Sequence, residues 1–188
     1  GGTGGFRAAG SISGTARRAT TFMPGRSLTL SPEARLDAIA LLLEDHTLLR
    51  KLSKEFSETT EEDVEKRKTM LKLIEAELNA HTTIEEELFY PAFLDASKDI
   101  EDARMVAEGI EEHRAADAKV IPDLHKSDPS MIAYSGQAKV LKDYLFHHLK
   151  EEEEEMFPKV RKLIDAKALR ELGDKMAARK KELLGELA

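Results

Sequence analysis

Two segments of the chain share one pattern, and this pattern decides the expected fold. Residues 74–91 read IEAELNAHTTIEEELFYP, and residues 141–158 read LKDYLFHHLKEEEEEMFP. In both, apolar residues recur every three or four positions, as on the buried stripe of a helix, until a His and a Glu take the next two inward positions. Burying a carboxylate is costly unless it is paired or bound to a metal. The pattern therefore predicts a cation inside a helical domain.

The two segments belong to an internal repeat with an offset of 67 residues. The offset relates three pairs of polar residues on expected inward faces: His46 with His113, His81 with His148, and Glu85 with Glu152. The apolar positions follow the same offset, so the chain is interpreted as two helical hairpins related by a pseudo-twofold axis. A lone His on an apolar stripe is usually a core residue, but matching residues at one offset predict a shared site.

Helical periodicity continues almost without interruption from residue 31, and no run of residues alternates as a strand would. We expect five helices, at residues 32–57, 62–90, 99–124, 128–157 and 166–187. Ser31 and Pro32 should start the first helix, Pro91 and Pro158 should end or bend the second and fourth, and Pro122 should kink the third. Long helices with short connections predict an all-α, up-down-up-down four-helix bundle with an extra C-terminal helix.

The first 30 residues differ in composition from the rest of the chain. They contain four Arg, no acidic residue, seven Gly and eight Ser or Thr. Such a segment has too little apolar surface to fold alone, so a disordered basic tail is expected at 1–30. The bundle is then expected at 31–160, and the C-terminal helix at 161–188 should pack on or beside it. An organellar transit peptide has a similar composition and is the alternative interpretation of the tail.

Composition excludes several classes of protein. The 188 residues include no Cys, which excludes disulfides and thiolate metal sites and favours a cytoplasmic location. The net charge is −7, which argues against a nucleic-acid partner because that would require clustered Lys and Arg. The longest apolar run, Ala38 to Leu43, is far below the roughly 18 residues that a membrane span needs. The sequence indicates no particular protein partner.

Four His and two Glu are more ligands than one tetrahedral zinc ion accepts, and they contain too much nitrogen for a calcium or magnesium site. They suit two transition-metal ions bridged by the two carboxylates. Two iron ions would leave positions for a bridging oxide or hydroxide and for a small molecule. Manganese and zinc remain alternatives because His and Glu accept all three metals.

The residues that carry this pattern resemble the haemerythrin-like (HHE) cation-binding family over about residues 36–160. The resemblance rests on His46, on Glu112-His113, and on the two H-x-x-x-E segments that each lead to an aromatic residue and Pro. It implies a non-haem di-iron protein that binds, senses or scavenges dioxygen, peroxide or nitric oxide, or that handles iron. The alternatives are an iron oxidase or peroxide-consuming enzyme at the same site, and a metal-free helical interaction module.

The third helix departs from the family's oxygen carriers, which have H-x-x-x-H where this chain has His113 and Asp117. Reversible oxygen carriage is therefore not expected. Asp117 is a candidate for an additional metal ligand, for an acceptor of a His N–H, or for an ion pair with Arg50, which occupies the equivalent repeat position. His147 should face away from the inward stripe, and His125 should lie near a helix end, so both are left out of the site.

Overall fold

The protein is described from a computed structural model that defines residues 35–186. The expected tail at 1–30 and the expected helix start at Ser31 and Pro32 lie outside the described residues. The described part is built from α-helices and from three short π-helical turns, η2 to η4. In chain order these elements are α1 (Ala38–Ser57), α2 (Val64–Ile84), η2 (Glu85–Phe89), α3 (Tyr90–Ala96), α4 (Ile100–Ala115), η3 (Ala116–Val120), α5 (Ile121–Lys126), α6 (Ile132–Glu151), η4 (Glu152–Met156), α7 (Phe157–Leu163) and α8 (Ala166–Glu186).

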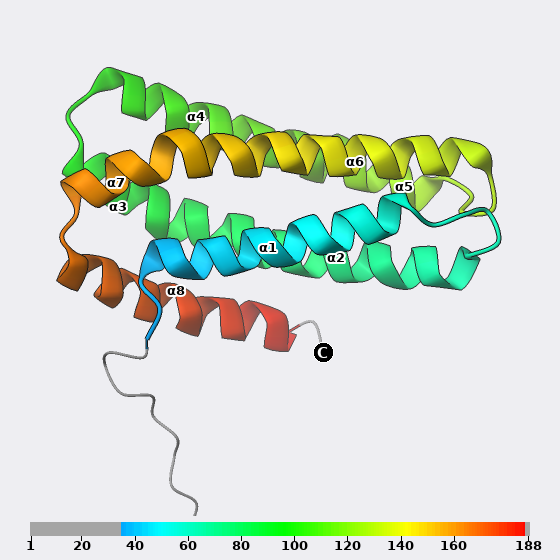
Figure 1. Ribbon diagram of the computed structural model, residues 1–188, viewed down its shortest axis with the longest axis horizontal. Helices are drawn as coiled ribbons and strands as arrows, with labels where there is room; N and C mark the ends of the chain where they lie inside the picture. The colour runs from blue at the N-terminus through cyan, green and yellow to red at the C-terminus, as the bar shows by residue number, and fades with distance from the viewer. Residues whose placement is uncertain (1–34, 187–188) are drawn as a thin grey trace, which may run out of the picture. The chain divides into compact units, whose positions relative to one another are not determined.

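The elements form four long rods in an up-down-up-down bundle, as predicted (Figure 1). The rods are α1, then α2 with η2 and α3, then α4 with η3 and α5, then α6 with η4 and α7. The fifth helix, α8, packs along α1, α2 and η2, which confirms that the C-terminal helix lies on the bundle. None of the helices among residues 35–186 combines the length and the hydropathy needed to cross a bilayer.

Two expected helix starts are wrong. The chain is not helical at residues 35–37, and α1 begins at Ala38, where the carboxylate of Asp37 caps the first turn by accepting a main-chain N–H at 2.8 Å. The fourth rod begins at Ile132 rather than at 128, because the Asp128 side chain accepts the main-chain N–H of Ser130 at 2.8 Å and so stabilises a turn. Acidic side chains at both places satisfy N–H groups that a helix would leave unpaired.

Pro91 does not end its rod, contrary to the expectation, and the rod that contains Pro158 also continues. Each of Pro91, Pro122 and Pro158 is the second residue of a helix that directly follows a π-helical turn, and the chain continues to Ala96, Lys126 and Leu163. Proline lacks an N–H and clashes with the carbonyl four residues earlier. The π-helical turn, in which an N–H bonds to the carbonyl five residues earlier, absorbs this misfit as a local widening of the helix.

Each π-helical turn also shifts which side chain faces inward. Leu88 was expected on the buried stripe, but Phe89 is fully buried there instead. Asp117 was expected on the same stripe of the third rod, but it is exposed, and Ala116 is buried in its place. A different cause acts in α1, where α8 covers one face. Leu42 packs in the same core cluster as residues of α8 and is buried, whereas Leu43 is 38% exposed.

The apolar core has two clusters that lie at opposite ends of the bundle. One cluster includes Ile39, Ile84 and Phe157 together with buried residues of α8. The other includes Leu49 and Leu145 and runs toward α5. On α1, His46 lies between the residues that contribute to the two clusters. A polar layer therefore crosses the middle of an apolar core.

Candidate metal centre

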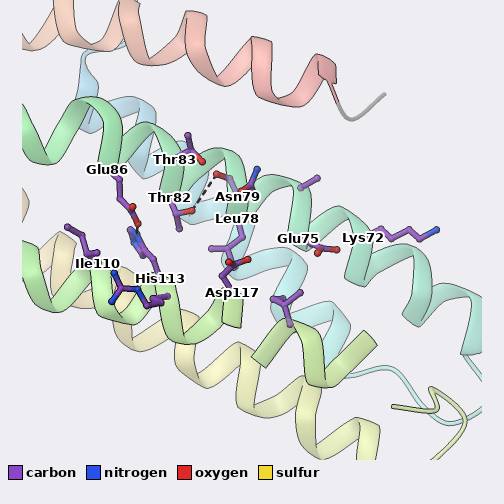
Figure 2. Close-up of a pocket in the computed structure, with 13 residues that line it drawn as sticks. Lys72, Glu75, Leu78, Asn79, Thr82, Thr83, Glu86, Ile110, His113 and Asp117 are labelled. Atoms are coloured by element: carbon purple, nitrogen blue, oxygen red, sulfur yellow. Dashed lines mark hydrogen bonds and ion pairs between the residues drawn. The ribbon is translucent and has the colours of Figure 1, made fainter. Parts of the chain in front are cut away.

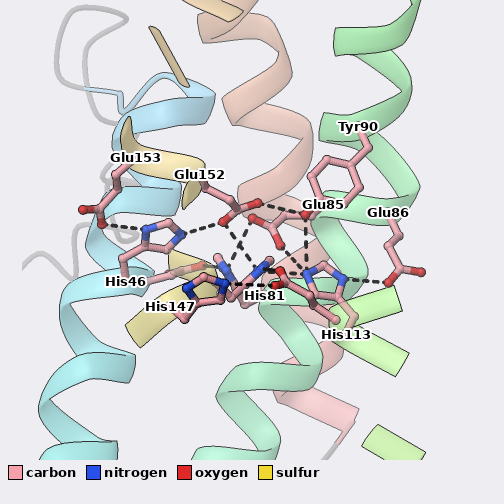
Figure 3. Close-up of polar contacts among 12 residues, drawn as sticks. His46, His81, Glu85, Glu86, Tyr90, His113, His147, Glu152 and Glu153 are labelled. Atoms are coloured by element: carbon pink, nitrogen blue, oxygen red, sulfur yellow. Dashed lines mark hydrogen bonds and ion pairs between the residues drawn. The ribbon is translucent and has the colours of Figure 1, made fainter. Parts of the chain in front are cut away.

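The structure brings the six residues predicted from the repeat into this polar layer (Figure 3). They come from all four rods, and none is more than 6% exposed: His46, His81, Glu85, His113, His148 and Glu152. The two π-helical turns η2 and η4 each begin at a Glu of this set. A π-helical turn at a functional site is a common feature of proteins, and here it sets the direction of both carboxylates.

The six side chains form two overlapping groups of donor atoms, and within each group all donors lie within 4.8 Å of one another. The first group contains His46, His81, Glu85 and Glu152, and the second contains Glu85, His113 and His148. Glu85 belongs to both groups. Its Oε1 lies 3.4 Å from His81 Nε2, and its Oε2 lies 3.4 Å from His113 Nε2. The two oxygens of the Glu85 carboxylate therefore face imidazoles of different donor groups.

Glu152 has the matching position between the other two imidazoles. Its Oε2 lies 3.2 Å from His46 Nε2 and 3.7 Å from His148 Nε2. Its Oε1 accepts a hydrogen bond of 2.8 Å from the Tyr90 hydroxyl. Glu152 thus has one oxygen that is held by a phenol and one that faces two imidazoles from different rods.

Several atoms at the centre of the layer are buried without a hydrogen-bond partner among the described residues. They are His46 Nε2, His81 Nε2, both oxygens of Glu85, and Glu152 Oε2. Buried polar groups are almost always hydrogen-bonded, and orphaned groups call for an explanation such as an ion. Imidazole nitrogens and carboxylate oxygens that converge in this way are the donors of a transition-metal site. The residues present therefore fit a transition-metal site.

Four further carboxylates face the imidazoles from outside, and sequence reasoning missed all of them. Three are hydrogen-bonded to their His, whereas Asp45 lies near His81 without a hydrogen bond. The outer nitrogen Nδ1 of each His faces one of them: Asp45 with His81 at 3.5 Å, Glu86 with His113 at 2.8 Å, Glu112 with His148 at 2.7 Å, and Glu153 with His46 at 2.8 Å. A carboxylate at Nδ1 favours the tautomer that leaves Nε2 free for a metal. These residues also follow the 67-residue offset, which was the signal that could have identified them.

Asp45 has a partner that lies outside the repeat. Its Oδ1 accepts a hydrogen bond of 2.5 Å from Lys180 Nζ in α8, and Lys180 also lies 3.3 Å from Glu77. Burial opposes ionisation of Asp45, but His81 and Lys180 lower its pKa. The C-terminal helix therefore contacts the metal centre through one buried ion pair.

The aromatic residues after the two Glu break the symmetry of the site. Tyr90 and Phe157 occupy equivalent positions of the repeat. The Tyr90 ring stacks on His113 with ring centres 5.8 Å apart, and the Phe157 ring stacks on His46 at 5.4 Å. Burial, with Glu85 next to it, raises the pKa of the Tyr90 hydroxyl well above its usual value, so this hydroxyl remains a donor.

The charges in the metal-free layer are strongly coupled. Burial and the neighbouring Glu152 raise the pKa of Glu85, whereas burial of Glu152 is outweighed by His148 and His46, which lower its pKa. Glu85 therefore holds a proton more tightly than Glu152 does. Burial lowers the pKa of His81 to about 4, so its imidazole is neutral, as a metal ligand must be.

Three residues considered from sequence lie outside both donor groups. Asp117 is exposed in a surface groove and is not paired with Arg50, whose guanidinium contacts Glu153 at 2.5 Å. The expectation that Asp117 lies on the buried seam is wrong, because Ala116, three residues after His113, takes the inward position. His147 and His125 are exposed, as expected.

Two grooves flank α4 and reach one half of the centre. A groove of about 650 Å³ between α2 and α4 extends to His113 (Figure 2). A groove of about 310 Å³ between α4 and the fourth rod extends to His148 and Glu152. His46 and His81 line neither groove and are fully buried. A small molecule can therefore approach the His113 and His148 half more readily than the other half.

Comparison with known proteins agrees with this arrangement. The model of the hemerythrin HHE cation binding domain matches residues 37–160. Uncharacterized proteins of Mycobacterium tuberculosis (Rv2633c) and Mycobacterium bovis are 30% identical over 151 residues, which is 80% of this chain and 89% of theirs. The crystal structure of a hemerythrin HHE cation binding domain-containing protein of Mycobacterium kansasii, a Rv2633c homolog, has a TM-score of 0.70 at 30% identity, with 80% and 89% of the two chains covered. The chain belongs to the hemerythrin HHE cation-binding domain family.

Proposed function

We propose that the protein binds two iron ions and uses them to bind, sense or scavenge dioxygen, peroxide or nitric oxide, or to handle iron. The observation that carries the proposal is the carboxylate of Glu85, which belongs to two donor groups and has no other partner among the described residues. One ion could not use both groups, because their imidazoles approach opposite oxygens of Glu85. Two ions, by contrast, would give a partner to His46 Nε2, His81 Nε2, Glu152 Oε2 and both oxygens of Glu85.

The chemistry of the donors supports iron, with manganese and zinc as the alternatives. Four imidazoles and two carboxylates suit a first-row transition metal better than a hard ion such as magnesium. When bound, iron would supply redox chemistry and coordination positions that the protein does not fill. The second donor group has only three protein residues, so open positions are expected beside His113 and His148.

The residues around the donors hold the site in place and limit its access to water. The outer carboxylates fix the imidazole tautomers, and Tyr90 holds one oxygen of Glu152. The two apolar clusters close the layer above and below. A small molecule would then arrive along the grooves beside α4, where Gly109 faces the Tyr90 hydroxyl and leaves room that a larger side chain would fill.

Iron content and the ultraviolet-visible spectrum test this proposal. After anaerobic reconstitution, about two irons per chain are expected, and exposure to air should produce the charge-transfer band of an oxo-bridged pair. His81→Ala and Glu85→Ala should each abolish stoichiometric binding. His125→Ala is the matched control, because it removes an exposed imidazole far from the centre. Less than about one iron per wild-type chain would exclude the proposal and favour a metal-free interaction module.

A second candidate is an enzyme at the same site that oxidises iron or consumes peroxide. It is favoured by the grooves that give His113 and His148 access to solvent. Peroxide in large excess separates the two candidates. An enzyme would consume peroxide over many turnovers, whereas a binding protein would change its spectrum without sustained consumption.

A further inference from the structure

We propose that Glu112, His147 and Glu151 form a second, surface site for a divalent transition-metal ion, and that metal reaches the buried centre through this site. The three residues lie on α4 and α6, beside the groove that extends to His148. The delivery role rests on the proposed function, because it requires a buried centre that takes up metal. The surface site itself depends only on these three side chains.

The three side chains can place their donors around one ion. His147 Nε2 lies 3.2 Å from Glu151 Oε1 and 3.9 Å from Glu112 Oε1. All three donors lie within 4.8 Å of one another. The side chain of His147 is 64% exposed, and Glu112 is only 17% exposed, so the group extends from solvent into the groove. An imidazole with two carboxylates from two helices favours a transition metal over calcium or magnesium.

The sequence carries this group as a second copy of the motif that forms the buried centre. His147 and Glu151 have the H-x-x-x-E spacing of His148 and Glu152, displaced by one residue onto an outer face. The equivalent positions in the first half of the repeat are Ala80 and Ile84, which are fully buried in the apolar cluster that α8 joins. In the first half of the repeat, packing against α8 therefore requires apolar residues on the outer face of α2. In the second half, the equivalent face of α6 is open and carries side chains that can bind a metal.

The groove connects the surface group to the buried centre. Glu112 belongs to both, because its Oε1 faces His147 while its Oε2 accepts from His148 Nδ1 at 2.7 Å. Glu151 and Glu152 line the same groove, and Glu152 Oε2 is a buried acceptor without a hydrogen-bond partner. A cation that leaves the surface group would thus meet an orphaned carboxylate oxygen further in.

The charge around the groove favours a cation. The lining includes three more acidic residues, Glu101, Glu108 and Glu155. The two basic residues of the lining are each paired with a carboxylate: Arg104 with Glu101 at 2.6 Å, and Lys159 with Asp102 at 2.6 Å. A groove with one dominant sign of charge raises the local concentration of the opposite ion. Divalent cations should therefore gather where the surface group lies.

Binding at the surface group can be measured after the buried centre is filled. Iron-loaded protein is titrated with Mn²⁺, and free Mn²⁺ is followed by its electron paramagnetic resonance signal. The wild type should bind one more ion, and the double variant His147→Ala/Glu151→Gln should bind it at least about tenfold more weakly. His125→Ala, which removes an imidazole from another exposed His–Glu pair, should bind like the wild type. Equal Mn²⁺ affinity in the wild type and the double variant would overturn the surface site.

Delivery is tested by the rate of anaerobic iron loading, followed by stopped flow. The double variant should load more slowly than the wild type by about tenfold and reach the same final iron content. Equal loading rates would overturn the delivery role. A double variant that loses the final iron content would also overturn it, since His147 would then act as a ligand of the centre. A wild type that takes up no iron would instead overturn the proposed function, and Mn²⁺ titration of that metal-free protein would still report on the surface site.

Discussion

Replacing Lys180 with Met tests whether the C-terminal helix supports the metal centre. Lys180 reaches from α8 into the bundle, where its Nζ lies 2.5 Å from Asp45 Oδ1 and 3.3 Å from Glu77 Oε2. Asp45 is 6% exposed, and its other oxygen faces His81 Nδ1 at 3.5 Å. Methionine keeps most of the apolar stem but removes the charge. Lys180→Met therefore leaves two carboxylates close together without their cation.

The expected loss of stability follows from this burial. Breaking a buried ion pair by removing one partner costs about 3–5 kcal/mol, because the remaining charge is unpaired. The Lys180 side chain is 17% exposed, so water can reach Asp45 in the variant, and the expected cost is about 3 kcal/mol, the lower end of that range. His81 also loses a fixed acceptor, which should weaken metal binding by about tenfold.

The neighbouring residue Arg179 provides a matched control. Arg179 contacts Glu87 through two hydrogen bonds, of 2.8 and 3.1 Å, but this pair is on the surface, and Arg179→Met should cost much less stability than Lys180→Met. Urea unfolding of the metal-free protein measures both variants. The double variant Asp45→Asn/Lys180→Met should recover most of the loss, because the buried charge is absent. If Lys180→Met costs no more than Arg179→Met, the reasoning is refuted, and unchanged iron affinity would show that Asp45 does not position His81.

Three other perturbations test separate parts of the structure. Arg67 is fully buried and donates four hydrogen bonds to acceptors near the interhelical loops, so Arg67→Met should lower the unfolding free energy by about 3 kcal/mol in urea without changing the iron content. Tyr90→Phe should cost about 1 kcal/mol in the same assay, since it removes the donor to Glu152 and a longer contact with His113, and loss of metal stoichiometry would contradict this. Burial opposes protonation of His148, but Glu152 and Glu112 outweigh it and raise its pKa above 6.5. A metal must displace that proton, so iron affinity measured by calorimetry should fall as the pH is lowered through a range that begins above 6.5, and Glu112→Gln should move this fall to lower pH.

The six central residues could be predicted because the 67-residue offset pairs each His with a His and each Glu with a Glu. His81 and Glu85 are one helical turn apart, and the same pair recurs at the 67-residue offset. The recurrence of the pair identifies the inward face of two rods without counting helical turns along the whole rod. The four-helix bundle followed from the same constraint and from the short connections between helices.

The register beyond the two Glu could not be predicted, because π-helical turns break the 3.6-residue period. Proline marks where the helix must change, but it does not decide between an end and a wider turn. That choice depends on what lies beyond. Phe93 in α3 and Val160 in α7 are fully buried, and continuing each rod places them in the core. For this reason the buried position expected at Leu88 lies one residue later, at Phe89.

The orienting carboxylates depend on which rods are neighbours, and this knowledge requires the fold. Glu86 and Glu153 each hold a His of the opposite repeat, whereas Asp45 and Glu112 each hold a His of their own repeat. Periodicity places these carboxylates on flanking faces, where an acidic residue is usually solvated. Lys180 had no signal in the sequence, because it lies outside the repeat and its helix shows only that it is amphipathic.

The differences between the two halves of the repeat all make the first half more enclosed than the second. In the first half, α8 covers the outer face and Lys180 holds Asp45, so the surroundings of His81 are closed. In the second half, the equivalent carboxylate Glu112 lies in an open groove beside His147. If the proposed two-ion site is correct, the position beside His46 and His81 would be enclosed and the position beside His113 and His148 would be open. We therefore expect the first position to hold its ion tightly and the second to exchange metal and meet small molecules.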